Sequence, residues 1–164
     1  MIITIDPAGT STTALFLFEN WNSWEFISFT DKNWLEQVKN LENLLKNKQP
    51  NFVAYEASNY LKNAFMNSHF TDLLKAIAGL ELILAKEQIE SKAISNIQVA
   101  GLESMARDGK IAGLVFKKEA GLTGRPKLVW YFKGKELSEH EKDALLVFYC
   151  WWVKISKKEW PFSD

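Results

Sequence analysis

The sequence predicts an α/β fold in which helices flank one mixed sheet of five strands. Three observations favour this fold. Short runs of β-branched and aromatic residues indicate strands, longer segments with helical spacing of apolar residues separate the later strands, and two acidic residues directly follow strand-like runs. With 164 residues, 47% of them hydrophobic, the chain is long enough to form a core, and we expect residues 1–164 to make one domain.

Three strands are predicted at the start of the chain. Residues 1–5 are rich in β-branched side chains and have the composition of a central strand. Turn-forming residues follow, and the segments 13–18 and 24–30 are the next two strands, joined by a short polar connection. Because connections this short join antiparallel neighbours, the three strands are expected to form an antiparallel meander.

A helix and a parallel strand are predicted next. Asp31 or Asn33 is suited to cap a helix that runs to about residue 47, because such side chains accept hydrogen bonds from the first helical amides. The strand at 52–55 then returns parallel to the first strand. Residues 59–90 are predicted to be largely helical. Their apolar positions recur with helical spacing at Leu73, Leu74, Ile77, Leu80, Ile83 and Leu84.

The last part of the chain is predicted to add a strand and a long helix. In order, the segments are a strand at 93–99, a short basic helix at 110–118, a loop at 120–126, and an extended segment or extra strand at 127–132. Ser138 and Glu141 form a capping box for a final helix, which is expected to run from 139 to about 156. The resulting order of three strands, helix, strand, helix, strand and helix is that of the ribonuclease H-like mixed sheet.

Four polar residues are the candidates for a functional site. Asp6 and Glu56 each follow a strand, and His140 and Asp143 lie three positions apart on one face of the final helix. Carboxylates that meet at one sheet edge repel each other, and a divalent cation relieves that repulsion. The set predicts a metal-dependent phosphodiesterase. Each residue also has a simpler role that remains open. Asp6 could be a turn acid, and Glu56 a solvated acid at the end of a strand. His140 could be a surface residue, and Asp143 could favour the helix N-terminus through its charge. The other histidine, His69, shows no partner and is expected in a loop or on the surface.

Four stretches, in order along the chain, resemble the RuvC-type Holliday junction resolvases of the ribonuclease H-like superfamily. They are Ile-Thr-Ile-Asp-Pro-Ala-Gly-Thr at 3–10, Tyr-Glu at 55–56, the segment 94–99 with the later Gly-Lys at 109–110, and Glu-His-Glu-Lys-Asp-Ala at 139–144. The resemblance implies that Asp6, Glu56 and Asp143 are metal-binding carboxylates and that His140 belongs to the same site. It implies an endonuclease that nicks four-way (Holliday) or other branched DNA junctions, with two Mg²⁺ or Mn²⁺ ions in each active site.

The resemblance also predicts contacts with DNA. Lys110 falls near a lysine that touches phosphate in the family, and Tyr60 lies one position from an aromatic residue that wedges into the junction centre. The other basic candidates for DNA contact are Lys62, Arg107, Lys117 and Lys118. Solvated surface lysines are the simpler explanation of such residues.

The distribution of charge gives further support for a nuclease. Residues 1–90 contain 7 basic and 11 acidic side chains, whereas residues 91–164 contain 13 basic and 9 acidic ones. An acidic half that holds metal and a basic half that contacts phosphate fit this function. The sequence departs from the family at Ala100, where another lysine is expected, and at 120–137, which is longer and more aromatic than the usual connection.

Three other functions remain open. The turn after Asp6 also resembles the first phosphate motif of actin-like ATPases and sugar kinases, although that fold needs two such domains and a second phosphate loop. A related ribonuclease H-like nuclease acting on RNA, or on flap or three-way DNA, is the second alternative. A non-catalytic relative that binds DNA or protein is the third, and loss of an acid would be its mark.

The expected partners are branched DNA and a second copy of the chain, because a four-way junction offers two symmetric strands to a two-fold protein. The apolar segments 73–84 and 144–153 are the candidate dimer interface, and a helicase partner is left open. The lone cysteine, Cys150, excludes a disulfide within the chain, the start lacks the basic region of a signal peptide, and the apolar runs are too short to span a bilayer. A cytoplasmic location without membrane contact is therefore expected.

Overall fold

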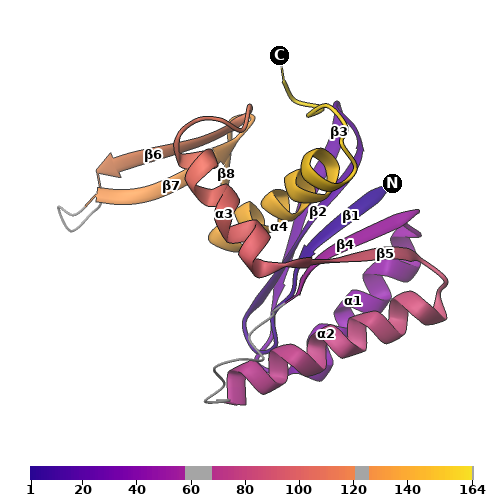
Figure 1. Ribbon diagram of the computed structural model, residues 1–164. Helices are drawn as coiled ribbons and strands as arrows, with labels where there is room; N and C mark the ends of the chain where they lie inside the picture. Colours follow the sequence, from indigo (N-terminus) through magenta and orange to yellow (C-terminus); the bar gives the residue numbers. More distant parts are fainter. Residues whose placement is uncertain (58–67, 121–125, 164) are drawn as a thin grey trace.

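A computed structural model describes residues 1–57, 68–120 and 126–163, and it contains the predicted mixed sheet. The five strands lie in the order β3-β2-β1-β4-β5 (Figure 1). They are β1 (Ile2–Asp6), β2 (Thr12–Asn20), β3 (Ser23–Thr30), β4 (Phe52–Ala57) and β5 (Glu90–Ser95). The first three strands pair antiparallel as a meander, and β4 and β5 continue the sheet parallel to β1. The predicted fold class is therefore confirmed.

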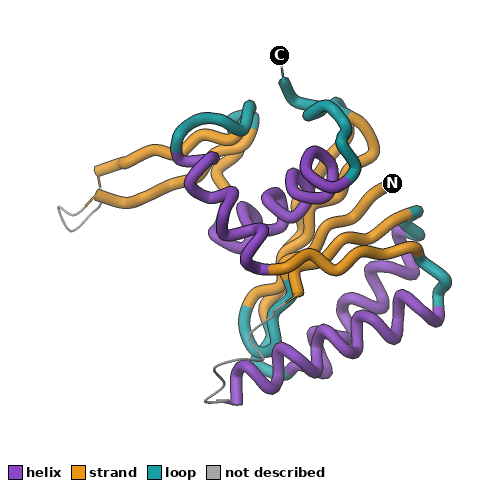
Figure 2. Tube along the Cα trace, in the orientation of Figure 1, coloured by secondary structure: helices purple, strands orange, loops and turns teal. Residues whose placement is uncertain are grey.

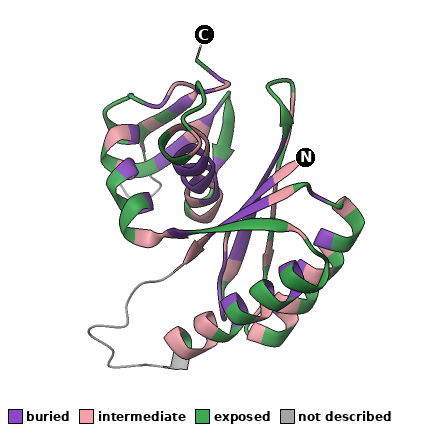
Figure 3. Cartoon of the chain, turned by 45° about the vertical axis from the view of Figure 1, so that its right-hand side comes forward, coloured by how far each residue is buried: buried purple, intermediate pink, exposed green. Residues whose placement is uncertain are grey.

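Helices cover both faces of this sheet (Figures 1 and 2). Helices α1 (Trp34–Lys48) and α2 (Ser68–Lys86) lie on one face, where Ile3 and Ile5 of β1 pack among their leucines and isoleucines. Helix α4 (Glu139–Tyr149) covers the opposite face with a cluster of aromatic side chains. Successive side chains of a strand point to opposite faces of the sheet, and here both faces are covered by helices. The central strands are therefore buried on both sides, which explains their nearly continuous apolar runs (Figure 3).

Most helix boundaries follow from local capping. Asn33 caps α1 by accepting from the amide of Leu35, as one of the two predicted capping residues. Ser138 and Glu141 form the predicted capping box of α4, whose last turn continues into a π-helix, η1 (Cys150–Ile155). The strand predicted at 93–99 is partly wrong, because β5 ends at Ser95 and helix α3 (Asn96–Arg107) begins at once. Ser95 and Gln98 form a second capping box that starts this helix.

A second sheet of three antiparallel strands extends away from the first one beside α3 and α4 (Figure 1). It consists of β6 (Leu114–Ala120), β7 (Pro126–Phe132) and β8 (Lys135–Leu137). The extra strand predicted at 127–132 is confirmed, but the basic helix predicted at 110–118 is wrong, since most of that segment is β6. Pairing in β6 and β7 places Leu114 and Phe116 beside Phe132 and Trp130 on one face. Burial of this apolar face against the core outweighs the lysine-rich composition.

The apolar segment near the end of the chain packs into the core of the same chain. The residues from Ala144 to Trp151 are buried in the core, and Trp151 stacks on Phe52 at 4.3 Å between ring centroids. The segment 144–153 therefore does not present the open apolar face that we expected for a dimer interface. Within the described ranges, none of the helices has the length and apolar character needed to cross a membrane.

Candidate active site

The carboxyl ends of β1 and β4 place two of the predicted acids side by side. These strands are parallel, and Ile5 pairs with Tyr55, so Asp6 and Glu56 occupy equivalent positions at one sheet edge. Both acids line a cavity of about 230 Å³. Its other walls come from the turn after β1, from α2 and from α3, through Pro7, Phe70, Leu73, Ile77 and Asn96. One side of the cavity is thus acidic and the other largely apolar.

A hydrogen bond from α4 to β1 positions the third element of the site. The hydroxyl of Thr4 donates to the carbonyl oxygen of Ala144 at 2.7 Å, and both residues are fully buried. Thr4 lies two residues before Asp6, and Ala144 directly follows Asp143. The start of α4 is therefore held against the end of β1.

His140 contacts Asp6 across this junction. The ring Nδ1 of His140 lies 2.8 Å from Oδ2 of Asp6. The hydrogen bond to Asp6 raises the pKa of His140, although burial of the ring opposes the change. His140 is thus a member of the site, and its carboxylate partner favours the protonated imidazolium.

Glu56 and Asp143 interact electrostatically with Asp6. Burial, reinforced by the charges of Asp6 and Asp143, raises the pKa of Glu56 to about 7. Burial also raises the pKa of Asp143 to about 6, although the ammonium of Lys142, at 3.0 Å from Oδ1, works in the opposite direction. The four predicted site residues therefore converge at one edge of the sheet, where the acids destabilise each other's ionised forms.

The chemistry of these residues fits a hard divalent cation. The donors are carboxylate oxygens and an imidazole, and a cation would restore the ionised form of the buried acids. Within the described ranges, however, no three side chains from His, Cys, Asp and Glu are arranged to hold one ion. Asp6 and Glu56, which share the cavity, are the pair of acids that could hold an ion. In this structure His140 is paired with Asp6, and Lys142 with Asp143.

Asn96 is a site residue that the sequence analysis missed. It is the first residue of α3 and lines the same cavity as Asp6 and Glu56. Its Oδ1 atom is buried and has no hydrogen-bond partner among the described residues. The signal was the sequence Ser-Asn-Ile-Gln, whose first and last residues form a capping box and start a helix directly after β5. A buried neutral oxygen without a partner in the described part of the chain therefore belongs to a residue that lines the cavity of the acidic pair.

The turn after Asp6 forms a second hollow of about 390 Å³, which both histidines of the chain line. Nδ1 of His69 lies 3.0 Å from the hydroxyl of Thr10, so the expectation that His69 lacks a partner is wrong. The turn passes very close to α2 at Gly9, where an added Cβ would lie 2.3 Å from the amide nitrogen of Leu73. Only glycine allows this close approach, which explains its place in the motif.

The predicted DNA-contacting residues lie away from the acids, and none of those described lines either cavity at Asp6. Arg107 pairs with Glu103 at 2.6 Å and stacks over Phe116, which gives it a structural role. Lys110 pairs with Asp108 at 3.0 Å. Tyr60 and Lys62 lie outside the described residues. The remaining candidates, Lys117 and Lys118, lie on β6 of the second sheet.

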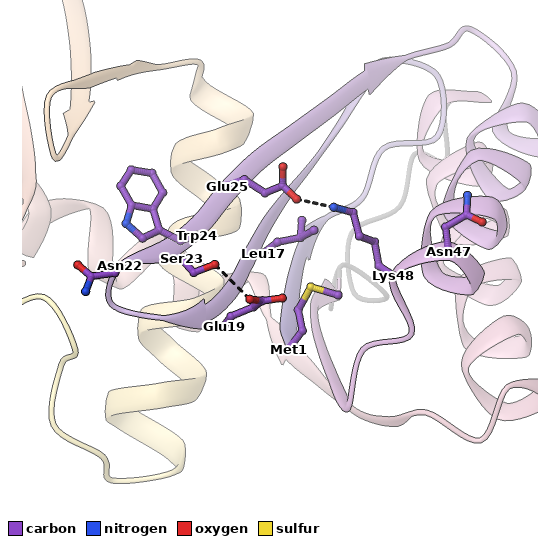
Figure 4. Close-up of a pocket in the computed structure, with 9 residues that line it drawn as sticks. All are labelled: Met1, Leu17, Glu19, Asn22, Ser23, Trp24, Glu25, Asn47 and Lys48. Carbon is purple, nitrogen blue, oxygen red and sulfur yellow. Dashed lines mark hydrogen bonds and ion pairs between the residues drawn. The ribbon is translucent and has the colours of Figure 1, made fainter.

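A further pocket, of about 470 Å³, lies at the opposite end of the sheet, beside Met1 and the β2–β3 turn (Figure 4). Ser23 donates a hydrogen bond to Glu19 there, and Lys48 pairs with Glu25. Each of its two acids is thus already engaged by a donor or a cation from the same pocket. This differs from the mutually repelling acids at Asp6 and Glu56, so the latter edge is the candidate active site.

Comparison with known proteins supports the fold assignment. No protein-family model matches the chain, and no curated protein matches it in sequence. Among solved structures, Thermus thermophilus RuvC in complex with a Holliday junction substrate aligns with a TM-score of 0.55 and 15% identity, over 91% of this chain and 93% of that one. A second structure of Thermus thermophilus RuvC gives a TM-score of 0.55 and 14% identity, over 94% and 96%. The chain thus has the RuvC-like, ribonuclease H-like fold along nearly its whole length.

Proposed function

We propose that this protein is a metal-dependent endonuclease that nicks four-way (Holliday) DNA junctions or other branched DNA by phosphodiester hydrolysis. One observation carries the proposal: Asp6, Glu56 and Asp143 converge at one edge of a RuvC-like sheet, where burial and mutual repulsion raise the pKa values of Glu56 and Asp143. The bound junction in the similar Thermus thermophilus structure supports branched DNA as the substrate.

Each side chain of the site has a role in this reaction. Asp6 and Glu56 would hold a Mg²⁺ or Mn²⁺ ion, with Asn96, whose Oδ1 is buried, lining the same cavity. When bound, such an ion activates water and relieves charge on the leaving oxygen. His140, which is hydrogen-bonded to Asp6 and lines the second hollow, would accept or donate a proton at the scissile phosphate. Asp143 completes the negative side of the site.

The second sheet is the best placed part of the described chain to bind DNA away from the acids. Lys117 and Lys118 lie on β6, in a hairpin that extends from the body of the protein (Figure 1). Contacts from these lysines to phosphates would strengthen binding without taking part in the chemistry. We also propose that two copies of the chain act together, since a four-way junction has two equivalent strands to nick.

The proposal is tested by cleavage of four-way, three-way, flap and RNA–DNA hybrid substrates with Mg²⁺ and with Mn²⁺. We expect nicking of the four-way junction, and loss of cleavage with retained or tighter binding in Asp6→Asn and Asp143→Asn. Binding is retained because each substitution removes a negative charge near phosphate. Asp108→Asn, at an exposed acid outside both cavities, is the matched control and should cleave normally. Normal cleavage by both active-site variants would overturn the site assignment.

The same panel separates the proposal from its alternative. Preferential cleavage of the RNA–DNA hybrid, the flap or the three-way substrate would support a related ribonuclease H-like nuclease instead. Sedimentation of the chain at micromolar concentration, with and without junction DNA, tests the dimer. A monomer under both conditions would argue against two copies acting together.

A further inference from the structure

Lys142 is a buried lysine beside the acids of the candidate site. Its side chain is only 3% exposed. The ammonium Nζ lies 2.8 Å from Oε2 of Glu139, 3.0 Å from Oδ1 of Asp143 and 3.4 Å from Oε2 of Glu103. A buried ammonium is costly unless carboxylates surround it, and three of them do so. The ammonium is therefore shielded from solvent by its own partners, one of which, Glu139, is itself 63% exposed.

Elements distant in the sequence hold this ammonium in place. The ring of Trp130, on β7, has its centroid 5.5 Å from Nζ of Lys142, and Trp130 is fully buried. Glu103, on α3, contacts both Lys142 and Arg107, whose guanidinium also lies over Trp130 at 6.0 Å. Side chains of the second sheet and of α3 thus both contact the lysine. Its charge is fixed at one position next to the site.

The position of this charge bears on how many ions the acids can hold. The resemblance to resolvases implies two ions, with Asp143 among their ligands. In the structure Asp143 already has a cation at 3.0 Å, and a divalent ion bound to the same carboxylate would be strongly repelled by the enclosed ammonium. Asp6 and Glu56 share a cavity that Lys142 does not line. Asp6 is also paired, with His140, but the side chain of His140 is 41% exposed whereas that of Lys142 is 3% exposed. The two halves of the site are therefore differently suited to a metal ion.

We propose that the ammonium of Lys142 takes the place of one of the two divalent cations, so that the site holds a single ion at Asp6 and Glu56. The inference rests on the proposed nuclease site and deepens it. Lys142 acts through Asp143, whose negative charge it balances, and is a positioning residue. The site would then have the charge balance of a two-ion centre with only one exchangeable metal.

The test is the stoichiometry of Mn²⁺ binding to the full chain, measured by calorimetry and by electron paramagnetic resonance of free Mn²⁺. We expect one ion per chain in the wild type and two in Lys142→Met, which keeps an unbranched side chain shorter by the terminal nitrogen and removes its charge. Lys142→Arg keeps the charge and should bind one ion. Lys135→Met is the matched control. Lys135 lies on β8 and pairs with Glu141, which is on the same helix as Lys142 but outside the acid cluster. This control should also bind one ion.

A second variant keeps the test valid if Lys142→Met fails to fold, because removing the lysine leaves buried carboxylates unpaired. Asp143→Asn should still bind one Mn²⁺, with affinity within about threefold of the wild type, since Asp6 and Glu56 are unchanged. Loss of an ion in Asp143→Asn, two ions in the wild type, no ion in the wild type, or one ion in a folded Lys142→Met would each overturn the inference.

The outcomes also separate this inference from the proposed function. One ion in the wild type and two in Lys142→Met, without cleavage of any substrate, would retain the inference and reject the nuclease. Cleavage of junctions by a wild-type protein that binds two ions would retain the nuclease and reject the inference.

Discussion

The hydroxyl of Thr4 and the carbonyl of Ala144 form a buried hydrogen bond of 2.7 Å that joins the first strand to the last helix. This contact lies two residues from Asp6 and one from Asp143, so it sets the distance between the two acids that come from opposite ends of the chain. The geometry of the site therefore depends on a residue that has no chemistry of its own.

Thr4→Val should lower the free energy of unfolding and reduce cleavage. The substitution preserves shape but removes the donor, which costs about 1 kcal/mol, or a few degrees in Tm for a chain of this size. Cleavage should fall by more than the change in the folded fraction, because the first turn of α4 is less well placed. Urea unfolding and single-turnover rates measure the two effects. Ser28→Ala, at an exposed position of β3, is the control and should change neither.

Glu56 should make the metal-free protein less stable as pH rises. Its pKa is raised from 4.5 to about 7 in the folded chain, so the folded state holds a proton that the unfolded state releases. The contribution of Glu56 to the free energy of unfolding is therefore full below about pH 4.5 and is lost as pH rises toward 7. Glu56→Gln should be more stable than the wild type by about 1–2 kcal/mol at pH 8 in EDTA, allowing for partial exposure, and equal to it near pH 4.

Calorimetric melting with and without Mg²⁺ measures this effect. Mg²⁺ should stabilise the wild type at pH 8 but not Glu56→Gln. The surface substitution Glu19→Gln should follow the wild type under every condition, because Glu19 lies at the other end of the sheet. A wild-type chain whose stability does not change between pH 5 and pH 8 in EDTA would contradict the prediction.

Gly9→Ala should destabilise the fold, because the new methyl group would collide with the backbone of α2 at Asp72 and Leu73. Relief of such overpacking typically costs roughly 1–3 kcal/mol. Gly101→Ala is a demanding control. Gly101 lies in the interior of α3, and an added methyl group there would point into open space, so this substitution should stabilise the chain by about 0.5–1 kcal/mol. Equal effects of the two substitutions in urea unfolding would contradict the close approach.

Asn96→Asp should tighten Mn²⁺ binding. The substitution adds a carboxylate at a residue that lines the cavity of Asp6 and Glu56, and we expect about tenfold in affinity, which corresponds to about 1.4 kcal/mol. In EDTA at pH 8 the same variant should melt at a lower temperature, because a third acid joins the cavity. Asn22→Asp, on an exposed turn outside the site, should leave both quantities unchanged. Unchanged Mn²⁺ affinity in Asn96→Asp would show that this residue does not face the ion.

Replacing Lys117 and Lys118 by glutamine should weaken junction binding but not the chemical step. Each lost phosphate contact should reduce the slope of log affinity against log salt by about 0.9. Binding is measured over a range of salt, and cleavage at saturating protein. Lys39→Gln, on the exposed side of α1, is the control and should keep the wild-type slope. An unchanged slope in both Lys117→Gln and Lys118→Gln would exclude the second sheet from the DNA interface.

Much of the fold could be predicted because its signals are local. The β-branched run before Asp6 and the run before Glu56 are strands, and the capping box at Ser138 places the start of α4 correctly. The error at 110–118 arose because pairing with another segment overrode the local composition. At 110–118 the lysines suggested a solvated helix, but pairing with β7 buries Leu114 beside Phe132.

The sequence by itself determined the order of the five strands of the main sheet and of α1, α2 and α4, and it placed an acid at the end of two parallel strands and at the start of the last helix. These features depend on runs and caps within a few residues. Only the tertiary structure decided that Lys142 is a buried charge. A lysine next to an aspartate at a helix start is ordinarily solvated, and its burial requires Glu103 from α3 and Trp130 from β7. Desolvation depends on which distant segments pack together, so its consequences for the site appear only in the folded chain.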